Sequence, residues 1–365
     1  MNVREFDFDL PPELIAQEPP PERGAARLLH LDRASGLITH TRVTALPELL
    51  RAGDLIVVNN TRVFPARLLG HRVPSGGTVE CLLIARVGSD PGPTPVRSRS
   101  DPGPTPVEFW EALVHPGQKL KPGARVIFDG IHPVHGEVLE RRFFGRRLVR
   151  LWTEDGSTID EAVDAIGHVP LPPYIKRDDR PDDRERYQTV FARTRGSVAA
   201  PTAGLHFTPA LAASLQARGI QRAEITLHVG YGTFQPVRVE RVEEHRLDAE
   251  QYEIGADAAA AIGAALGEGR RVIAVGTTTT RTLEAVARAH DGAIVAGRGA
   301  TDLFIYPGFE FRVVRGLLTN FHLPRSSLFM LVSAFGGVEH VRAAYQSAIA
   351  ERYAFYSYGD AMLIL

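Results

Sequence analysis

The sequence predicts an α/β main domain built from both chain ends, with a small antiparallel β-barrel domain inserted in its first third. Apolar runs alternate with helical patterns after residue 153, and this alternation is typical of an α/β sheet. Between residues 67 and 152, short β-rich runs follow one another without helical patterns between them, which favours an antiparallel sheet closed into a barrel. The 365 residues are enough for about two domains. We therefore expect domains at 1–65 with 154–365 and at 66–153.

The first strong element is an apolar run at 54–58, which stops at Asn59 and Asn60 as a buried strand stops at a polar edge. Turns such as HPGQ and KPG separate the β-rich runs of the expected barrel, which lie at 79–87, 107–114, 124–128 and 147–152. The eight residues SDPGPTPV occur twice, at 89–96 and 100–107. Because this repeat is rich in Pro, Gly and Ser, it predicts a flexible duplicated surface loop at 89–107 that carries no chemistry.

The α/β part contains one strong helix signature. Thr208 is the expected N-cap, Pro209 the first helical residue and Gly219 the C-terminal stop. Strands are expected at 223–229, 271–275 and 301–306, and helices at 257–266, at 280–289, after Pro324 and after Val338.

Composition and charge exclude several classes of protein. The net charge of -1 gives no global basic field. Cys81 is the single cysteine, so no intrachain disulfide is possible, and its apolar β context predicts a buried structural role. The histidine pair His132 and His135 lacks the partners of a zinc spacing, so we expect no metal site. The sequence shows neither a signal-peptide pattern nor a run of about 20 apolar residues. We therefore expect no membrane partner and a cytoplasmic location.

Four segments place polar residues at the ends of apolar runs, where open α/β sheets bind ligands. In VGTTTTR, Gly276, Thr277, Thr278 and Arg281 lie between a strand and a helix. Hydroxyls, free N–H groups and a guanidinium at that place suit a carboxylate or a ribose, whereas the alternative is a tight turn with a threonine cap. The segment matches neither GxGxxG nor GxxxxGK[ST], so neither a dinucleotide nor a triphosphate is indicated.

The second segment, HVGYGTF, begins with His228 at the end of a strand. Its two glycines allow close approach of a ligand, and an aromatic ring beside them suits a sulfonium or ammonium group, although simple packing is the alternative. The residues concerned are Gly230, Tyr231, Gly232, Thr233 and Phe234.

The other two segments contribute histidines. His206 in APTAGLHFTPA precedes a helix N-terminus, where the helix dipole favours a neutral imidazole available as a base; the alternative is a structural histidine bonded to backbone. Asn320 and His322 in TNFHLP follow apolar residues and precede a helix, and both are equally compatible with a hydrogen-bonded turn.

The segment RRFFGRRLVR at 141–150 is dense in arginine and phenylalanine. Arginines in such a segment could bind phosphate groups of RNA and its phenylalanines could stack on exposed bases; the alternative is a solvated edge strand.

Taken together and in order, these segments resemble the S-adenosylmethionine:tRNA ribosyltransferase-isomerase family of queuosine biosynthesis. The matching stretches include LIVVNNTRVFPARLLG, PLPPYI, SVAAPTAGLHFT, HVGYGTFQPV, VGTTTTRTLE, LLTNFHLPRSSLFMLVSAF and the terminal SYGDAMLIL. They cover both chain ends and most of the α/β part, whereas the inserted β region matches more loosely. Tyr231 between the two glycines and the four-threonine run after Gly276 are small departures.

The resemblance implies a glycosyltransferase-class transferase. It would move the ribosyl part of S-adenosylmethionine onto 7-aminomethyl-7-deazaguanine at the wobble position of tRNA, isomerise it, and release adenine and methionine to give epoxyqueuosine in tRNA. A sulfonium acidifies the adjacent C5′ hydrogens, and adenine departs better when protonated. The chemistry therefore asks for a base, an acid and water exclusion, with S-adenosylmethionine as cosubstrate and no metal or redox cofactor. No obligate protein partner is inferred.

Under this hypothesis each group of residues has a role. His206 and His228 act as base or acid. The residues expected to hold the cosubstrate are Gly230, Tyr231, Gly232, Thr233, Gly276, Thr277, Thr278, Arg281, Asn320 and His322. Those expected to contact tRNA phosphates are Arg62, Arg67, Arg141, Arg142, Arg146, Arg147 and Arg150. Two rival functions remain: a methyltransferase that uses S-adenosylmethionine, and a non-catalytic RNA-binding module that uses the barrel.

Overall fold

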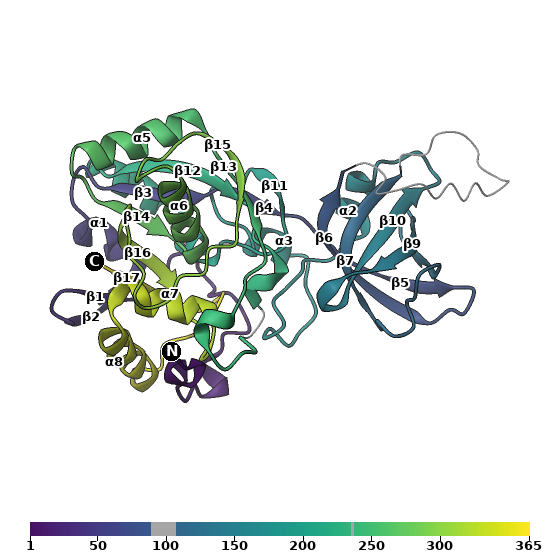
Figure 1. Ribbon diagram of the computed structural model, residues 1–365, viewed down its shortest axis with the longest axis horizontal. Helices are drawn as coiled ribbons and strands as arrows, with labels where there is room; N and C mark the ends of the chain where they lie inside the picture. The colour runs from purple at the N-terminus through teal and green to yellow at the C-terminus, as the bar shows by residue number, and fades with distance from the viewer. Residues whose placement is uncertain (89–106, 235–236) are drawn as a thin grey trace. The chain divides into compact units, whose positions relative to one another are not determined.

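The computed structural model describes residues 1–88, 107–234 and 237–365, and these form two compact units (Figure 1). The first unit comprises Met1–Arg62, Pro172–Asp178 and Glu185–Leu365, and the second comprises Val63–Leu171 and Asp179–Arg184. One large mixed sheet and one closed six-stranded barrel make up most of the strands. The expected α/β main domain with an inserted antiparallel barrel is therefore confirmed. The domain boundaries at 65 and 153 stay a prediction, and the duplicated loop lies outside the described residues except for Val107.

The first unit is organised around a nine-stranded sheet. In spatial order its strands are β15 (Gly297–Thr301), β13 (Glu250–Ile254), β12 (Gln221–Leu227), β3 (Leu55–Asn59), β14 (Val272–Val275), β16 (Val314–Asn320), β17 (Ala361–Ile364), β1 (Arg27–Leu31) and β2 (Ile38–Arg42). The four central strands β12, β3, β14 and β16 run parallel to one another. Their carboxyl ends therefore open at the same edge of the sheet.

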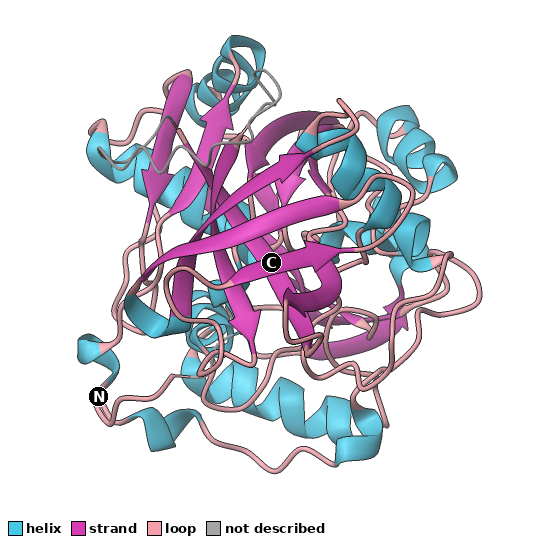
Figure 2. Ribbon diagram, turned by 90° about the vertical axis from the view of Figure 1, so that its right-hand side faces the viewer, coloured by secondary structure: helices cyan, strands magenta, loops and turns pink. Residues whose placement is uncertain are grey.

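Helices cover both faces of this sheet because its central strands are apolar on both sides (Figure 2). Along β3, Leu55 and Val57 join a core shared with α5 (Ala256–Gly267), α6 (Thr277–Ala289), α7 (Ser327–Gly336) and α8 (Val338–Ala350). Ile56 and Val58 point to the opposite core, which is shared with α1 (Leu46–Leu49) and α4 (Pro209–Ala217). The alternation follows from the two-residue period of a strand.

Helix α6 begins three residues earlier than the sequence pattern suggested, at Thr277. Gly276 is its N-cap and has φ of 95°, a conformation that glycine adopts without strain. Thr279, Thr280 and Thr282 donate their hydroxyl hydrogens to the carbonyls four residues earlier, so the threonine run is compatible with helix. The strand expected at 301–306 is wrong, because β15 ends at Thr301.

The second unit contains the closed barrel, with strand order β10–β7–β6–β5–β8–β9. The strands are β5 (Arg67–Val73), β6 (Thr78–Val87), β7 (Glu108–His115), β8 (Arg125–Phe128), β9 (Val134–Arg141) and β10 (Arg146–Thr153), all paired antiparallel. Cys81 is 2% exposed inside this barrel. Helix α2 (Ile159–Ile166) follows, started by a capping box between Thr158 and Glu161. Three short elements complete the fold: β4 (Thr61–Val63) pairs with β11 (Thr194–Ser197), and α3 spans Asp183–Arg186.

Arg147 in β10 is buried within the barrel unit and is not a surface arginine. Its guanidinium donates to the carbonyl oxygens of Gly117 at 3.0 Å, Gly145 at 2.9 Å and Leu120 at 3.3 Å. These carbonyls lie in the loops before β8 and β10, so the side chain ties two barrel loops together. Its predicted role as a phosphate contact is at odds with this burial.

We expect Arg147→Ala to lower the free energy of unfolding of the barrel by about 3 kcal/mol, because several buried carbonyls lose their donor. Both tryptophans, Trp110 and Trp152, lie in this unit, so tryptophan fluorescence during urea unfolding measures it directly. The control is Arg141→Ala on the exposed end of β9, for which we expect a change within about 0.5 kcal/mol. Equal losses for the two variants would contradict this role.

Candidate active site

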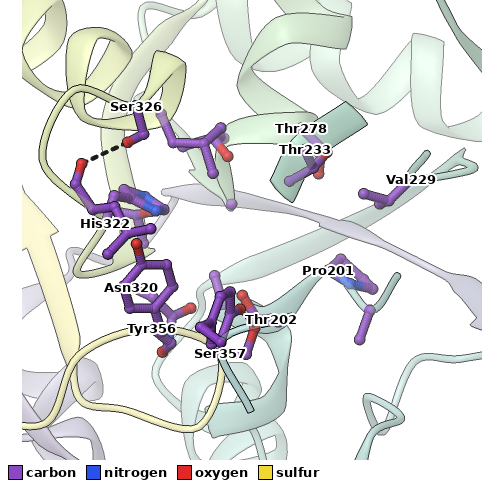
Figure 3. A pocket seen from close by; sticks show the side chains of 18 of the residues that line it. Pro201, Thr202, Val229, Thr233, Thr278, Asn320, His322, Ser326, Tyr356 and Ser357 are labelled. Atoms are coloured by element: carbon purple, nitrogen blue, oxygen red, sulfur yellow. Dashed lines mark hydrogen bonds between the residues drawn. The ribbon is translucent and has the colours of Figure 1, made fainter. Parts of the chain in front are cut away.

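A cavity of about 190 Å³ lies beyond the carboxyl ends of β12, β14 and β16 in the first unit. All four polar segments singled out in the sequence contribute to its wall (Figure 3). Thr278, Thr233 and Val229 lie on one side of it, and His322 and Ser326 lie on the other (Figure 3). Of the predicted cosubstrate residues, those in the wall are Thr233, Gly276, Thr277, Thr278, Asn320 and His322.

No charged side chain lines this cavity among the residues that the structure describes. Its polar groups are threonine and serine hydroxyls, one amide and one imidazole, and its apolar groups include the rings of Tyr174 and Tyr356. The cavity is therefore suited to a ligand that is held by neutral hydrogen bonds and aromatic faces. A cation entering it meets no positive side chain.

Asn320 connects the cavity to His206. Its Nδ2 donates to the Tyr356 carbonyl at 3.0 Å and lies 3.1 Å from Nε2 of His206. Because a carbonyl only accepts, this contact fixes the orientation of the amide, and Nε2 of His206 must accept the second bond. The hydrogen of the neutral His206 ring is thus on Nδ1. Burial lowers the pKa of His206 from 6.5 to about 4, so the ring is neutral at physiological pH.

His322 is the imidazole that reaches the cavity wall. Its Nε2 is 2.8 Å from the hydroxyl oxygen of Thr319, and its backbone N–H donates to the Tyr345 hydroxyl at 2.9 Å. Burial lowers its pKa from 6.5 to about 3, so this ring is neutral as well.

His228 lies at the end of β12 but outside the cavity wall. Its Nδ1 is 2.8 Å from the hydroxyl oxygen of Thr61, and burial lowers its pKa. The two predicted catalytic histidines therefore both have partners of their own, and neither His206 nor His228 lines the cavity.

Arg281 and Glu250 form a buried ion pair behind the cavity, with side chains 6% and 5% exposed. Nη1 of Arg281 is 2.6 Å from Oε2 of Glu250, and its Nε donates to the Leu303 carbonyl at 2.8 Å. Oε1 of Glu250 accepts from the backbone N–H of Gly230 at 2.9 Å and from the Thr233 hydroxyl at 3.3 Å. The structure thus gives Arg281 a carboxylate of its own chain. The pair anchors the turn from Gly230 to Thr233, which brings Thr233 to the cavity.

Sequence reasoning missed Tyr356, whose backbone has φ of 77° although it is not glycine. Such a conformation costs about 1–3 kcal/mol in a residue other than glycine. Its ring centroid lies 4.1 Å from that of Tyr174, which also lines the cavity. Burial raises its pKa, and among the described residues neither its hydroxyl oxygen nor Oδ1 of Asn320 has a hydrogen-bond partner. The nearest sequence signals were the quoted stretches: PLPPYI contains Tyr174, and Tyr356 is the residue directly before SYGDAMLIL.

The arginines expected to contact tRNA are mostly engaged with acidic neighbours. The pairs are Arg62 with Glu185, Arg67 with Glu80, Arg142 with Glu140, Arg146 with Glu111 and Arg150 with Glu137. Arg141 is exposed, and two residues later in the sequence Phe143 is 88% exposed. Most of the positive charge of the arginine-rich segment 141–150 is therefore already paired with carboxylates.

Within the described part of the chain, no three His, Cys, Asp or Glu side chains are grouped so that they would hold a metal ion. His132 and His135 have separate partners, Asp155 at 2.8 Å and Glu154 at 3.7 Å. No described helix is long and apolar enough to cross a bilayer.

Residues 3–364 match the model of a family described as queuosine biosynthesis protein. The chain belongs to this family. The S-adenosylmethionine:tRNA ribosyltransferase-isomerases of Desulfitobacterium hafniense and Heliobacterium modesticaldum are 49% and 48% identical to it, and each alignment covers 100% of both chains. The crystal structure of S-adenosylmethionine tRNA ribosyltransferase from Thermotoga maritima is 37% identical, with a TM-score of 0.53 over 99% of this chain and 100% of that chain.

We expect Glu250→Gln to destabilise the first unit of this family member by about 3–5 kcal/mol, because it leaves Arg281 buried without its counter-charge. The double variant Glu250→Gln with Arg281→Met should recover part of that loss. Urea unfolding followed by helical circular dichroism measures both, since α4 to α8 all lie in this unit. Additive losses in the double variant would show that the pair is not coupled.

We also expect the stability of the first unit to fall as the pH drops from 7.5 to 5.5. The folded pKa values of His206 and His322 lie near 4 and 3, below the ordinary value of 6.5, so the unfolded chain takes up protons first. The urea midpoint should be lower at pH 5.5, and His206→Asn should reduce this difference. An unchanged midpoint between the two pH values would contradict the neutral state assigned to these rings.

Proposed function

We propose that this protein transfers and isomerises the ribosyl moiety of S-adenosylmethionine onto 7-aminomethyl-7-deazaguanine at the wobble position of tRNA. Epoxyqueuosine in tRNA, adenine and methionine are the products. The observation that carries the proposal is the match to relatives of this name over 100% of both chains at 48–49% identity. A shared name at this identity and coverage, together with one cavity at the strand ends, supports a shared reaction.

The cavity supports the proposed chemistry through its charge and its aromatic rings. The sulfonium of S-adenosylmethionine meets no cationic side chain in the described wall, and Tyr174 and Tyr356 offer aromatic faces to it. A largely apolar wall also excludes water from an intermediate that would otherwise hydrolyse. The reaction is a group transfer without net oxidation or reduction, so it needs no redox cofactor.

We assign residues to this reaction by their place relative to the cavity. Gly276, Thr277 and Thr278 hold the ribose or the methionine end of the cosubstrate at the start of α6. His322 takes the acid–base role first expected of His206 and His228, because it is the one histidine among the described residues of the wall. Gly230, Tyr231, Gly232 and Arg281 shape the wall without being part of it.

His206 is proposed as a positioning residue that acts through Asn320. Nε2 of His206 and the Tyr356 carbonyl both accept from the Asn320 amide and together hold it in one orientation.

For tRNA, we propose that phosphate contacts come from the exposed Arg141 and from Arg62, Arg67, Arg142, Arg146 and Arg150. In the complex, the ion pairs that these arginines form with acidic neighbours would be replaced by ion pairs with phosphates. Arg147 is assigned to the barrel fold.

The decisive experiment is incubation of the protein with S-adenosylmethionine and tRNA carrying 7-aminomethyl-7-deazaguanine, followed by chromatography and mass spectrometry. We expect adenine release to equal the number of modified nucleosides formed. S-adenosylhomocysteine in place of adenine would identify a methyltransferase. Binding of tRNA without any turnover would identify an RNA-binding module.

Thr278→Val should raise the KM for S-adenosylmethionine about tenfold, because it removes one hydroxyl from the cavity wall at nearly constant shape. Thr282→Val is the matched control on the same helix. It removes a buried hydroxyl that donates to the Thr278 carbonyl, and Thr282 is not among the residues that line the cavity, so the KM should stay unchanged. Equal KM values for the two variants would remove Thr278 from the cosubstrate site.

A further inference from the structure

A second, smaller cleft lies beside the cavity in the first unit, and two arginines line it. Its volume is about 20 Å³, and its wall includes Arg23, Arg186 and His206. Ser357 belongs to the wall of this cleft and to the wall of the main cavity. A group in the cleft and a ligand in the cavity would therefore be neighbours.

The two arginines are held in place by backbone carbonyls of opposite loops. Arg23 donates to the carbonyls of Gln188 at 2.5 Å and Glu185 at 2.9 Å. Arg186 donates to the carbonyls of Pro21 at 3.0 Å and Pro20. These contacts brace two loops against each other and use two of the five N–H donors of each guanidinium. Three donors remain on each side chain.

Neither arginine of this pair forms an ion pair with a carboxylate of the described residues. No acidic side chain of the described residues lies within ion-pair distance of Arg23 or Arg186, and the nearby Glu185 carboxylate is instead 4.0 Å from Arg62. Burial and the neighbouring Arg186 lower the pKa of Arg23 even though the Glu185 carboxylate opposes this effect, which agrees with two guanidinium groups held close together. An anion between them would relieve this repulsion.

The imidazole of His206, which also lines the cleft, favours an anion as well. Because Nε2 of His206 accepts from Asn320, its Nδ1 carries the hydrogen and is a donor. A volume of 20 Å³ holds about one water-sized group, which matches a single anionic oxygen.

We propose that Arg23, Arg186 and His206 form an anion site that holds one end of a substrate whose other part occupies the main cavity. The inference rests on the proposed function, which offers two anionic groups of this kind: a tRNA phosphate and the carboxylate of S-adenosylmethionine. The described wall of the main cavity has no cationic side chain for either, and Arg281 is already paired with Glu250. The cleft supplies the positive charge that the cavity lacks.

The test uses Arg23→Gln and Arg186→Gln, because glutamine removes the positive charge and keeps a polar side chain. The matched control is Arg184→Gln. Arg184 also donates to two backbone carbonyls, those of Asp164 and Gly167, but it does not line the cleft. Unfolding midpoints measured for all three variants verify that they remain folded.

Two measurements separate the two anions. If a tRNA phosphate occupies the cleft, each Gln variant should make the negative slope of log binding constant against log salt concentration less steep, by about 0.7. If the carboxylate occupies it, the intact protein should bind S-adenosylmethionine at least about tenfold more tightly than its decarboxylated analogue, and each Gln variant should lose this preference. Salt slopes and analogue preferences equal to those of Arg184→Gln would overturn the anion site.

Adenine release by the intact protein keeps this test separate from the proposed function. Without adenine release the proposed reaction fails, whatever the variants do. A changed salt slope or analogue preference in the two Gln variants would still establish the anion site.

Discussion

The central constraint on this structure is that four parallel strands, β12, β3, β14 and β16, are buried on both faces. Strands of this kind need helices on both sides, and the connections that supply them bring all four carboxyl ends to one edge. The chain then places its polar segments where these strands end. The cavity is the consequence, because small and hydroxyl-bearing residues at the edge cannot fill the space that the helices leave.

The neutral wall of the cavity depends on buried groups behind it. Glu250 neutralises Arg281 and holds the turn that brings Thr233 forward. His206 and the Tyr356 carbonyl fix the Asn320 amide from behind. In both cases a buried polar group is satisfied by another protein group, which leaves hydroxyls, one amide and one imidazole for the ligand.

Arginine has three different roles in this chain, and burial distinguishes them. Arg147 and Arg281 are buried and satisfy the polar groups of their own unit, one with carbonyls and the other with a carboxylate. Arg146 and Arg150 are paired with acids on neighbouring barrel strands. Arg23 and Arg186 are half-buried, line one cleft and form no ion pair with an acid of the described residues, which is an arrangement suited to a bound anion.

The sequence by itself determined the fold class, the family and the segments that form the cavity. Local signals sufficed for this, because the Thr208 cap, the Gly276 turn and the strand-end Asn320 each depend on neighbours along the chain. Strands without such a signal were missed. Of the five residues of β13, only Glu250 and Ile254 are buried, and β17 is defined by its pairing with β1 at the other end of the chain.

Only the tertiary structure decided which side chains face the cavity. Arg281 meets a glutamate 31 residues away, and His206 meets an amide 114 residues away. Strand ends and helix starts can be recognised from a few consecutive residues, whereas the partner of a buried polar group depends on which distant segment packs against it. That is the physical reason why the segments were predictable and the roles of Arg281, Arg147, His206 and Tyr356 were not.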